Sequence, residues 1–204
     1  MLDTYGRRFA ERFITPGAKL FQKLNWSPTQ VTLLACAVGL FGALTVLWHW
    51  PVGVSIALLW LSGYLDTVDG SLARRTGRTS AIGTLLDIFL DRVVELSYII
   101  ALVVREPDAA FSSMLLCASI TLSMTVFLTA GNLLKNTGVK TFRYQTGLME
   151  RTDGFILTTA MLALKGCLKY TAAVYAALIL FTAIQRLAIT IWELREDEKT
   201  MKEQ

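Results

Sequence analysis

The sequence has little of what multi-histidine metal centres and disulfide-stapled domains are built from. Its 204 residues include 3 cysteines, 4 prolines and 1 histidine, and only 18% are charged. A single histidine excludes a metal centre with several imidazole ligands. Cys36, Cys117 and Cys167 lie in apolar segments without paired spacing, which indicates small core residues and excludes a disulfide framework. Any chemistry in this chain is therefore expected from carboxylates, lysines or arginines.

Apolar residues are abundant instead, at 53% of the chain with a mean hydropathy of +0.48, which is typical of an integral membrane protein. The chain carries a net charge of +4, but its basic residues lie between apolar runs and form no single patch, so no nucleic-acid partner is expected. Six runs match the roughly 20 residues of a spanning helix: 31–50, 51–69, 81–104, 110–134, 155–168 and 171–192. The sequence therefore predicts an all-α membrane protein with six transmembrane helices.

The segment before the first run has its own pattern. Leu2, Tyr5, Phe9 and Phe13 share one helical face, which predicts an amphipathic helix in the membrane interface, with a solvated arm as the alternative. We expect one domain over residues 1–204, made of an interfacial arm (1–25), a six-helix core (26–194) and a cytoplasmic tail (195–204) that holds the acidic run 196–198.

The distribution of basic residues predicts the orientation. Fifteen lysines and arginines belong to the N-terminal arm, the segments after the second and fourth runs, and the C-terminal tail, whereas three lie on the other side. Basic residues favour the cytoplasmic side, so both termini are expected there. His49 stands between Trp48 and Trp50 at the opposite end of the first run, which indicates an interfacial aromatic belt.

Four aspartates lie in or beside the second and third runs: Asp66, Asp69, Asp87 and Asp91. A charged side chain at the bilayer centre costs about 2.5–3.5 kcal/mol on insertion scales, so such a group needs an offset. Nearness to the cytoplasmic surface lowers the cost, and protonation or bound cations would relieve the mutual repulsion. These carboxylates are therefore candidates for a functional site.

Small residues accompany the carboxylates. At about 100° per residue, the residues within about 60° of Asp66 on its stripe are Asp69, Gly70 and Ala73. On the next helix Asp87 and Asp91 lie about 40° and 80° from Gly83. Carboxylates beside vacant space suggest a bound ligand. Three nearby arginines could donate hydrogen bonds to a phosphate group of that ligand: Arg74, Arg75 and Arg78.

These residues form a motif with fixed spacing, Asp66-x2-Asp69-Gly70-x2-Ala73-Arg74-x8-Gly83-x3-Asp87-x3-Asp91. It resembles, at every specified position, the signature of the CDP-alcohol phosphotransferase (CDP-alcohol phosphatidyltransferase) family. The segment 27–32 before the first run is also similar to the family's entry to its first span, although Thr29 stands where asparagine is commoner. The six runs and the amphipathic arm are likewise similar to the family.

The resemblance implies metal-dependent transfer of a substituted phosphate from a CDP-linked alcohol, most often CDP-diacylglycerol, to the hydroxyl of a second alcohol, with release of CMP. It implies two Mg²⁺ or Mn²⁺ ions held by Asp66, Asp69, Asp87 and Asp91, with Asp91 also the general base. It assigns the nucleotide and diphosphate to Gly70, Ala73, Arg74 and Gly83. A homodimer in contact with membrane lipid is implied as well.

The acceptor alcohol is less well specified. Residues 147–151 are similar to a segment of the family's inositol-phosphate branch, which makes Arg143 and Arg151 candidates for binding an acceptor phosphate. That branch usually carries basic residues near the end of its fourth span, and residues 129–134 contain none. Inositol phosphate and glycerol 3-phosphate are thus the acceptors we expect.

Two rival functions remain. Intramembrane carboxylates also mark cation-coupled transporters, although no inverted repeat or broken helix is evident. A catalytically inactive homologue is the second rival, and the complete signature argues against it. The roles of Glu95 and Arg186 stay open: Glu95 either extends the carboxylate stripe or pairs with Arg92 or another helix, and Arg186 either contacts the acceptor or snorkels.

Overall fold

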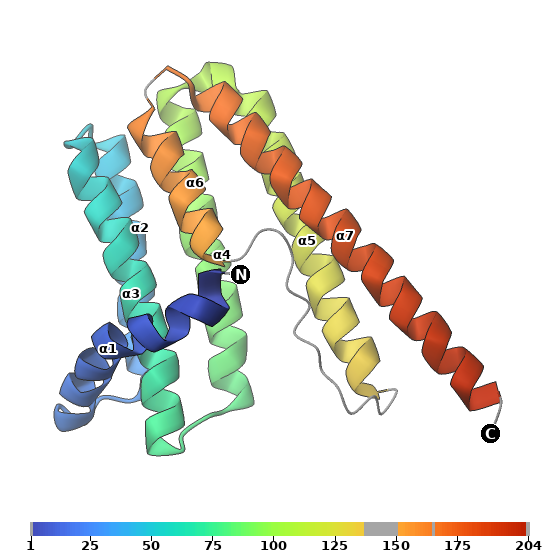
Figure 1. The fold of residues 1–204 in the computed structure, drawn as a ribbon. Coiled ribbons are helices and arrows are strands. Elements are labelled where there is room, and N and C mark those ends of the chain that lie inside the picture. The colour runs from blue at the N-terminus through green and yellow to red at the C-terminus, as the bar shows by residue number, and fades with distance from the viewer. Residues whose placement is uncertain (1, 137–150, 165, 203–204) are drawn as a thin grey trace. The chain divides into compact units, whose positions relative to one another are not determined.

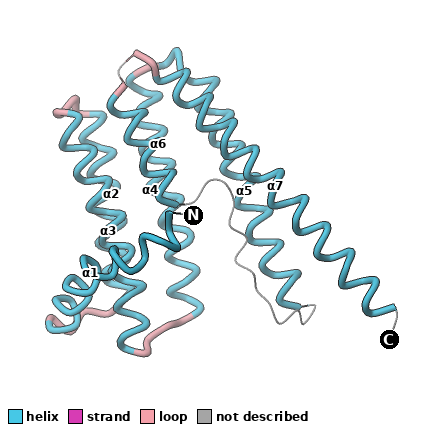
Figure 2. The backbone as a smooth tube through the Cα atoms, in the orientation of Figure 1, coloured by secondary structure: helices cyan, strands magenta, loops and turns pink. Residues whose placement is uncertain are grey.

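The computed structural model describes residues 2–136, 151–164 and 166–202. Within these ranges all regular elements are helical (Figures 1 and 2). The α-helices are α1 (Leu2–Lys23), α2 (Pro28–Leu47), α3 (Val52–Thr76), α4 (Ala81–Arg105), α5 (Ala110–Asn136), α6 (Arg151–Ala163) and α7 (Leu168–Lys202), and a 3₁₀ turn, η1 (Pro107–Ala109), precedes α5.

Four helical segments are long and apolar enough to cross a membrane: Pro28–Leu47, Val52–Thr76, Pro107–Leu133 and Leu168–Glu196. The prediction of an all-helical, multi-pass membrane protein is therefore confirmed. Two of the six predicted spans do not meet this standard. The α4 segment carries several ionisable residues, and α6 has 13 residues, or about 20 Å, against a hydrocarbon core of about 30 Å.

Helix boundaries follow local chemistry. Ser27 and Gln30 form a capping box around Pro28 at the start of α2. Gly77 ends α3 in a left-handed conformation with φ of 65°, which a residue without a side chain adopts without strain. Ser80 then caps α4 by accepting a 3.0 Å hydrogen bond from the amide of Gly83.

The chain forms two compact units, and each is described by itself. The first consists of residues 1–107 and 155–168, and therefore contains α1 to α4 and most of α6. Here α2 packs against both α3 and α4, and α1 packs against α3. In Figure 1 α3 runs opposite to α2, α4 and α6.

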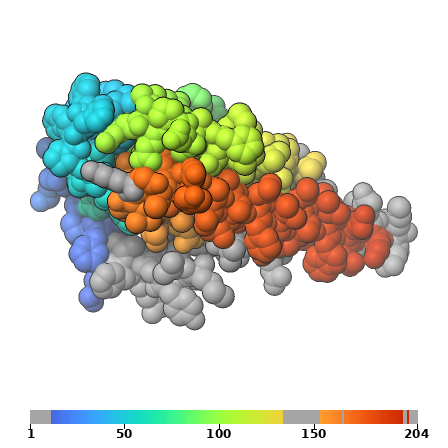
Figure 3. Space-filling view, turned by 90° about the horizontal axis from the view of Figure 1, so that it is seen from above, coloured from blue at the N-terminus to red at the C-terminus, as the bar shows by residue number. Residues whose placement is uncertain are grey.

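The second unit, residues 108–154 and 169–204, contains α5 and most of α7, which run in the same direction in Figure 1. The surface of α7 is visible along its length in Figure 3.

Close helix contacts in the first unit depend on small and hydroxylated residues. The buried Thr45 and Ser55 hydroxyls of α2 and α3 hydrogen-bond at 2.8 Å. The hydroxyl of Tyr98 on α4 donates to the Ser55 carbonyl at 3.0 Å. A Cβ atom on Gly42 would lie 1.9 Å from that tyrosine oxygen, so α2 and α4 can approach this closely only at a glycine.

The fifth predicted span, 155–168, extends past the end of its helix, because α6 ends at Ala163 and Gly166 takes a left-handed φ of 77°. The sixth, 171–192, lies within α7. In the segment predicted to be the cytoplasmic tail, α7 continues as a helix through the acidic residues to Lys202. An exposed contact of 3.4 Å between Lys199 and Glu196 lies on this extension.

Candidate active site

Three carboxylates from two helices converge in the first unit. Asp66 and Asp69 on α3 and Asp87 on α4 each offer an oxygen, and these atoms all lie within 4.8 Å of one another. Asp66 and Asp69 are 7% and 6% exposed, whereas Asp87 is half-buried. Because α3 continues without a break to Thr76, the two aspartates of α3 are held on one rigid helical turn.

The donor set fits a divalent cation. Carboxylate oxygens are the ligands that Mg²⁺ and Mn²⁺ prefer, and three of them gathered out of bulk water repel one another unless positive charge or protons are added. The cluster is therefore a candidate divalent-metal site.

Asp91 does not belong to this three-residue cluster. It lies one turn beyond Asp87 on α4, is half-buried, and is near enough to the buried Cys36 thiol of α2 for an electrostatic interaction. Its position differs from that of the other three signature aspartates, which is compatible with a different role.

The small residues of the signature are of two kinds. A Cβ atom on Gly70 would meet only the Arg74 guanidinium, at 3.4 Å, so helix packing does not require glycine there. A Cβ atom on Gly83 would lie 3.1 Å from the Ser80 hydroxyl, so this glycine also accommodates the helix cap. Ala73 is half-buried and Arg74 is exposed. Open space at Gly70, beside a guanidinium, is what a phosphate ligand would need.

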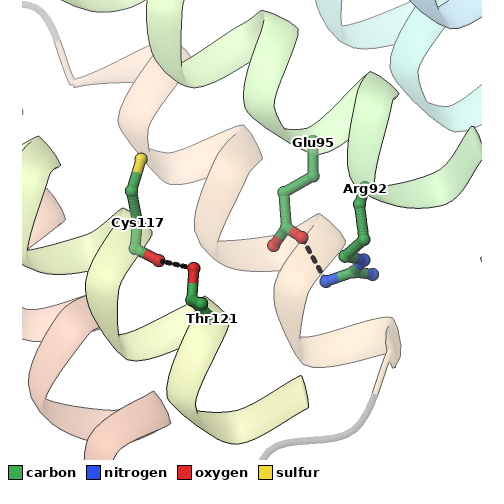
Figure 4. Close-up of polar contacts among 4 residues, drawn as sticks. All are labelled: Arg92, Glu95, Cys117 and Thr121. Carbon is green, nitrogen blue, oxygen red and sulfur yellow. Dashed lines mark hydrogen bonds and ion pairs between the residues drawn. The ribbon is translucent and has the colours of Figure 1, made fainter. Parts of the chain in front are cut away.

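Arg92 and Glu95 form an ion pair on α4 (Figure 4). Their side chains are 33% and 15% exposed. Of the alternatives left open for Glu95, the structure thus records pairing with Arg92.

In the second unit, Figure 4 also shows the Thr121 hydroxyl donating to the Cys117 carbonyl one turn earlier on α5, a bond of 2.9 Å.

The candidate acceptor residues are less fully described. Arg143 lies outside the described residues, and Arg151 begins α6. In the second unit the Arg186 guanidinium of α7 lies over the ring of Phe127 on α5, 5.4 Å from its centre. This aromatic partner could not be predicted from the sequence, because α5 and α7 are distant along the chain and Phe127 is one of 10 phenylalanines.

Comparison with known proteins identifies the family. The model of the CDP-alcohol phosphatidyltransferase family matches residues 25–194. This chain belongs to that family. Its members are enzymes, and the class predicted from the aspartate signature is confirmed.

Several curated relatives are named as synthases of phosphatidylinositol phosphate or archaetidylinositol phosphate. The archaetidylinositol phosphate synthase of Aeropyrum pernix is 31% identical over 93% of this chain and 96% of that protein. The phosphatidylinositol phosphate synthase of Corynebacterium glutamicum is 27% identical over 93% and 89%. A local match to the phosphatidylinositol phosphate synthase of Streptomyces avermitilis, 39% identical, spans 47% of this chain and only 39% of that protein.

The fold is similar to that of solved structures as well. Mycobacterium tuberculosis phosphatidylinositol phosphate synthase with CDP-DAG bound has a TM-score of 0.71 and 20% identity, covering 88% of this chain and 94% of that one. A second structure of the same enzyme, in complex with manganese and citrate, also has a TM-score of 0.71, at 21% identity and 88% coverage of both chains. At this identity the likeness establishes the fold.

Proposed function

We propose that this protein transfers a phosphatidyl group from CDP-diacylglycerol to a hydroxyl of inositol phosphate and releases CMP, as a step of phospholipid biosynthesis. The observation that carries the proposal is the convergence of Asp66, Asp69 and Asp87 within an unbroken family signature. The names of the Aeropyrum and Corynebacterium relatives support the choice of inositol phosphate over glycerol 3-phosphate, which is the second candidate acceptor.

The residues have distinct proposed roles. Asp66, Asp69 and Asp87, with Asp91 nearby, would hold two divalent ions, Mg²⁺ or Mn²⁺. Bound there, the ions supply positive charge that neutralises the diphosphate and the departing CMP. Cytidine and its phosphates would lie against the open side of Gly70 and the small residues Ala73 and Gly83, and Arg74 would donate to a phosphate oxygen.

Asp91 is the proposed general base. The acceptor oxygen forms a bond to the β-phosphorus while the bond from that phosphorus to the CMP oxygen breaks, and the hydroxyl proton passes to the Asp91 carboxylate. The half-buried position of Asp91, apart from the other three carboxylates, suits a group that must remain able to accept a proton. Arg143 and Arg151 are the proposed contacts of the acceptor phosphate.

We propose further that the chain crosses the membrane six times: α4 and α6 cross it in addition to the four long apolar segments. Hydroxyl bonds, small residues and the Arg92–Glu95 pair make it feasible for α4 to lie within the bilayer despite its ionisable residues. Both termini and the carboxylates then face the cytoplasm, in accordance with the basic residues. The whole chain acts as one catalytic domain in a homodimer, as the family resemblance implies.

The test is acceptor-dependent CMP release. Purified protein is incubated with CDP-diacylglycerol and Mg²⁺ or Mn²⁺, and inositol phosphate, glycerol 3-phosphate, inositol, serine and ethanolamine are offered separately. CMP and the lipid product are measured by mass spectrometry, with a parallel arm that uses a CDP-linked archaetidyl lipid. CMP with inositol phosphate alone is the expected result. CMP only with glycerol 3-phosphate would favour the second candidate, whereas no CMP with any acceptor would favour transport or an inactive homologue.

A further inference from the structure

Helix α1 has two separate apolar faces. One packs on the first unit, where Ala18 is fully buried and Ile14 and Phe21 lie against the core residues Val31, Val68 and Leu72. The other consists of Phe13 and Leu20 and is continued by Leu24, the first residue after the helix; these side chains are 60%, 56% and 56% exposed. At about 100° per residue Leu20 and Leu24 project about 20° to either side of Phe13, so the three span about 40°, and the packed face is about 80–140° from Phe13. A helix that already packs by one face does not need the second for folding.

A basic stripe borders the exposed apolar face. Arg12, Lys19 and Lys23 lie about 80–120° from Phe13, on the side away from the packed face, and all three are exposed. No acidic residue occurs between Arg12 and Leu24. Around α1 the order is therefore packed face, exposed apolar face, basic stripe. With Phe13, Leu20 and Leu24 against acyl chains, the flexible basic side chains reach the level of the head groups.

The charge of this surface identifies its partner. A zwitterionic head-group layer carries no net charge. Anionic phospholipids attract juxtamembrane lysines and arginines, and each such residue raises the membrane affinity about fivefold. A protein partner with an acidic surface would match the stripe but would leave the adjoining row of exposed apolar side chains without acyl chains to cover it.

Helix α1 contacts residues of α3 that neighbour the carboxylates. The Tyr64 hydroxyl of α3 donates to the Phe13 carbonyl at 3.0 Å. A Cβ atom on Gly17 would lie 2.5 Å from that hydroxyl and 3.0 Å from Val68 Cγ2. Val68 immediately precedes Asp69, so α1 supports the helical turn that carries Asp66 and Asp69.

We infer that α1 is a binding surface for anionic phospholipid, and that its lipid-bound position holds the Asp66–Asp69 turn of α3 for catalysis. The link to catalysis rests on the proposed function, whereas the lipid-binding surface does not. Lipid binding and turnover are therefore measured separately.

The first measurement is lipid retention. Wild type, the triple variant Arg12→Gln/Lys19→Gln/Lys23→Gln and the control Lys169→Gln/Arg195→Gln/Lys199→Gln are placed in membranes that mix phosphatidylglycerol with phosphatidylcholine. Native mass spectrometry then counts the lipids that each protein retains. We expect wild type and control to prefer phosphatidylglycerol and the α1 variant to lose that preference by about tenfold or more. The inference would be overturned if all three proteins retained phosphatidylglycerol equally. It would also be overturned if a bound protein, and not lipid, occupied this surface of α1.

The second measurement is CMP release in nanodiscs of phosphatidylcholine alone or with phosphatidylglycerol, at constant CDP-diacylglycerol. Wild type and control should be faster with phosphatidylglycerol, and added salt should reduce the difference. The α1 variant should be slow and insensitive to lipid charge. If the wild-type rate does not depend on lipid charge, lipid binding at α1 does not support catalysis. If no CMP is released under any condition, the proposed function is wrong. The lipid-retention result decides in either case whether α1 binds anionic phospholipid.

Discussion

At the residue scale, Asp91 lies one helical turn from the clustered carboxylates, so metal binding and proton removal can be tested apart. Asp91→Asn keeps the shape of the side chain but removes its ability to accept the proton. Turnover should fall by about 10²–10⁴-fold or more. Binding of Mn²⁺, measured by electron paramagnetic resonance, should persist because the oxygens within 4.8 Å of one another come from Asp66, Asp69 and Asp87.

Asp69→Asn is the matched comparison, since it makes the same chemical change inside the cluster. It should weaken Mn²⁺ binding together with turnover. If Asp91→Asn instead retained near-normal rates, the proton acceptor would have to be another group.

The ion pair of α4 gives a second prediction. Glu95→Gln leaves the half-buried Arg92 guanidinium without its anionic partner, which should cost about 1–3 kcal/mol of stability. The double variant Arg92→Leu/Glu95→Leu removes both charges and should be more stable than Glu95→Gln. Thermal unfolding in detergent, followed by circular dichroism, ranks the three proteins. A Glu95→Gln protein as stable as wild type would show that the pair contributes little.

The sequence could place the carboxylates on their helix faces because the spacing of a motif fixes angles around a helix. It could not decide the partner of Glu95, because Asp91 and Arg92 both precede it by about one turn and spacing alone ranks neither interaction. That choice depends on side-chain surroundings. The same applies to Arg186 and Phe127, whose contact joins two helices that no motif connects.

At the element scale, the approach of α2 to α4 depends on Gly42. Gly42→Ala places a methyl group 1.9 Å from the present position of the Tyr98 oxygen and 3.0 Å from its Cζ atom, so the ring must move and its bond to Ser55 is lost. We expect a loss of about 1–3 kcal/mol in stability. Thermal unfolding in detergent measures it.

Gly53→Ala is the control, because no atom lies within 4 Å of its Cβ position. It should leave stability nearly unchanged. Tyr98→Phe frees space at Gly42 at the cost of one hydrogen bond, about 1 kcal/mol, so the double variant Gly42→Ala/Tyr98→Phe should lose less stability than the two single changes added together. Strict additivity would mean that Gly42 and Tyr98 do not interact.

Helix positions were predictable where hydropathy and capping coincide, as at Ala81, the observed start of α4. Hydropathy failed at α6, because the apolar run continues to Leu168 while the backbone leaves the helix near Gly166. There the Gly166 amide donates to Glu106 at 3.5 Å, a contact between residues that are distant in sequence. The helical extension of α7 was missed for the opposite reason, since polar residues that end a membrane span need not end a helix.

At the scale of the whole molecule, the charge pattern predicts the orientation in the membrane, because lysines and arginines are retained on the cytoplasmic side during insertion. In the first unit the α3–α4 loop and the α6–α7 connection lie at opposite ends of the helices (Figure 1). One residue in each can therefore report the two sides of the membrane.

Cys167, in the α6–α7 connection, is an exposed native thiol, whereas Cys36 is buried and Cys117 is half-buried. With Cys36 and Cys117 changed to alanine, Cys167 should react with a membrane-impermeant maleimide added to right-side-out spheroplasts. Thr79→Cys, in a background that also lacks Cys167, lies in the exposed α3–α4 loop and should react only after the membrane is opened. The reverse pattern would place the carboxylates on the outer face, away from a cytoplasmic supply of CDP-linked lipid and acceptor, and would contradict both the orientation and the proposed reaction.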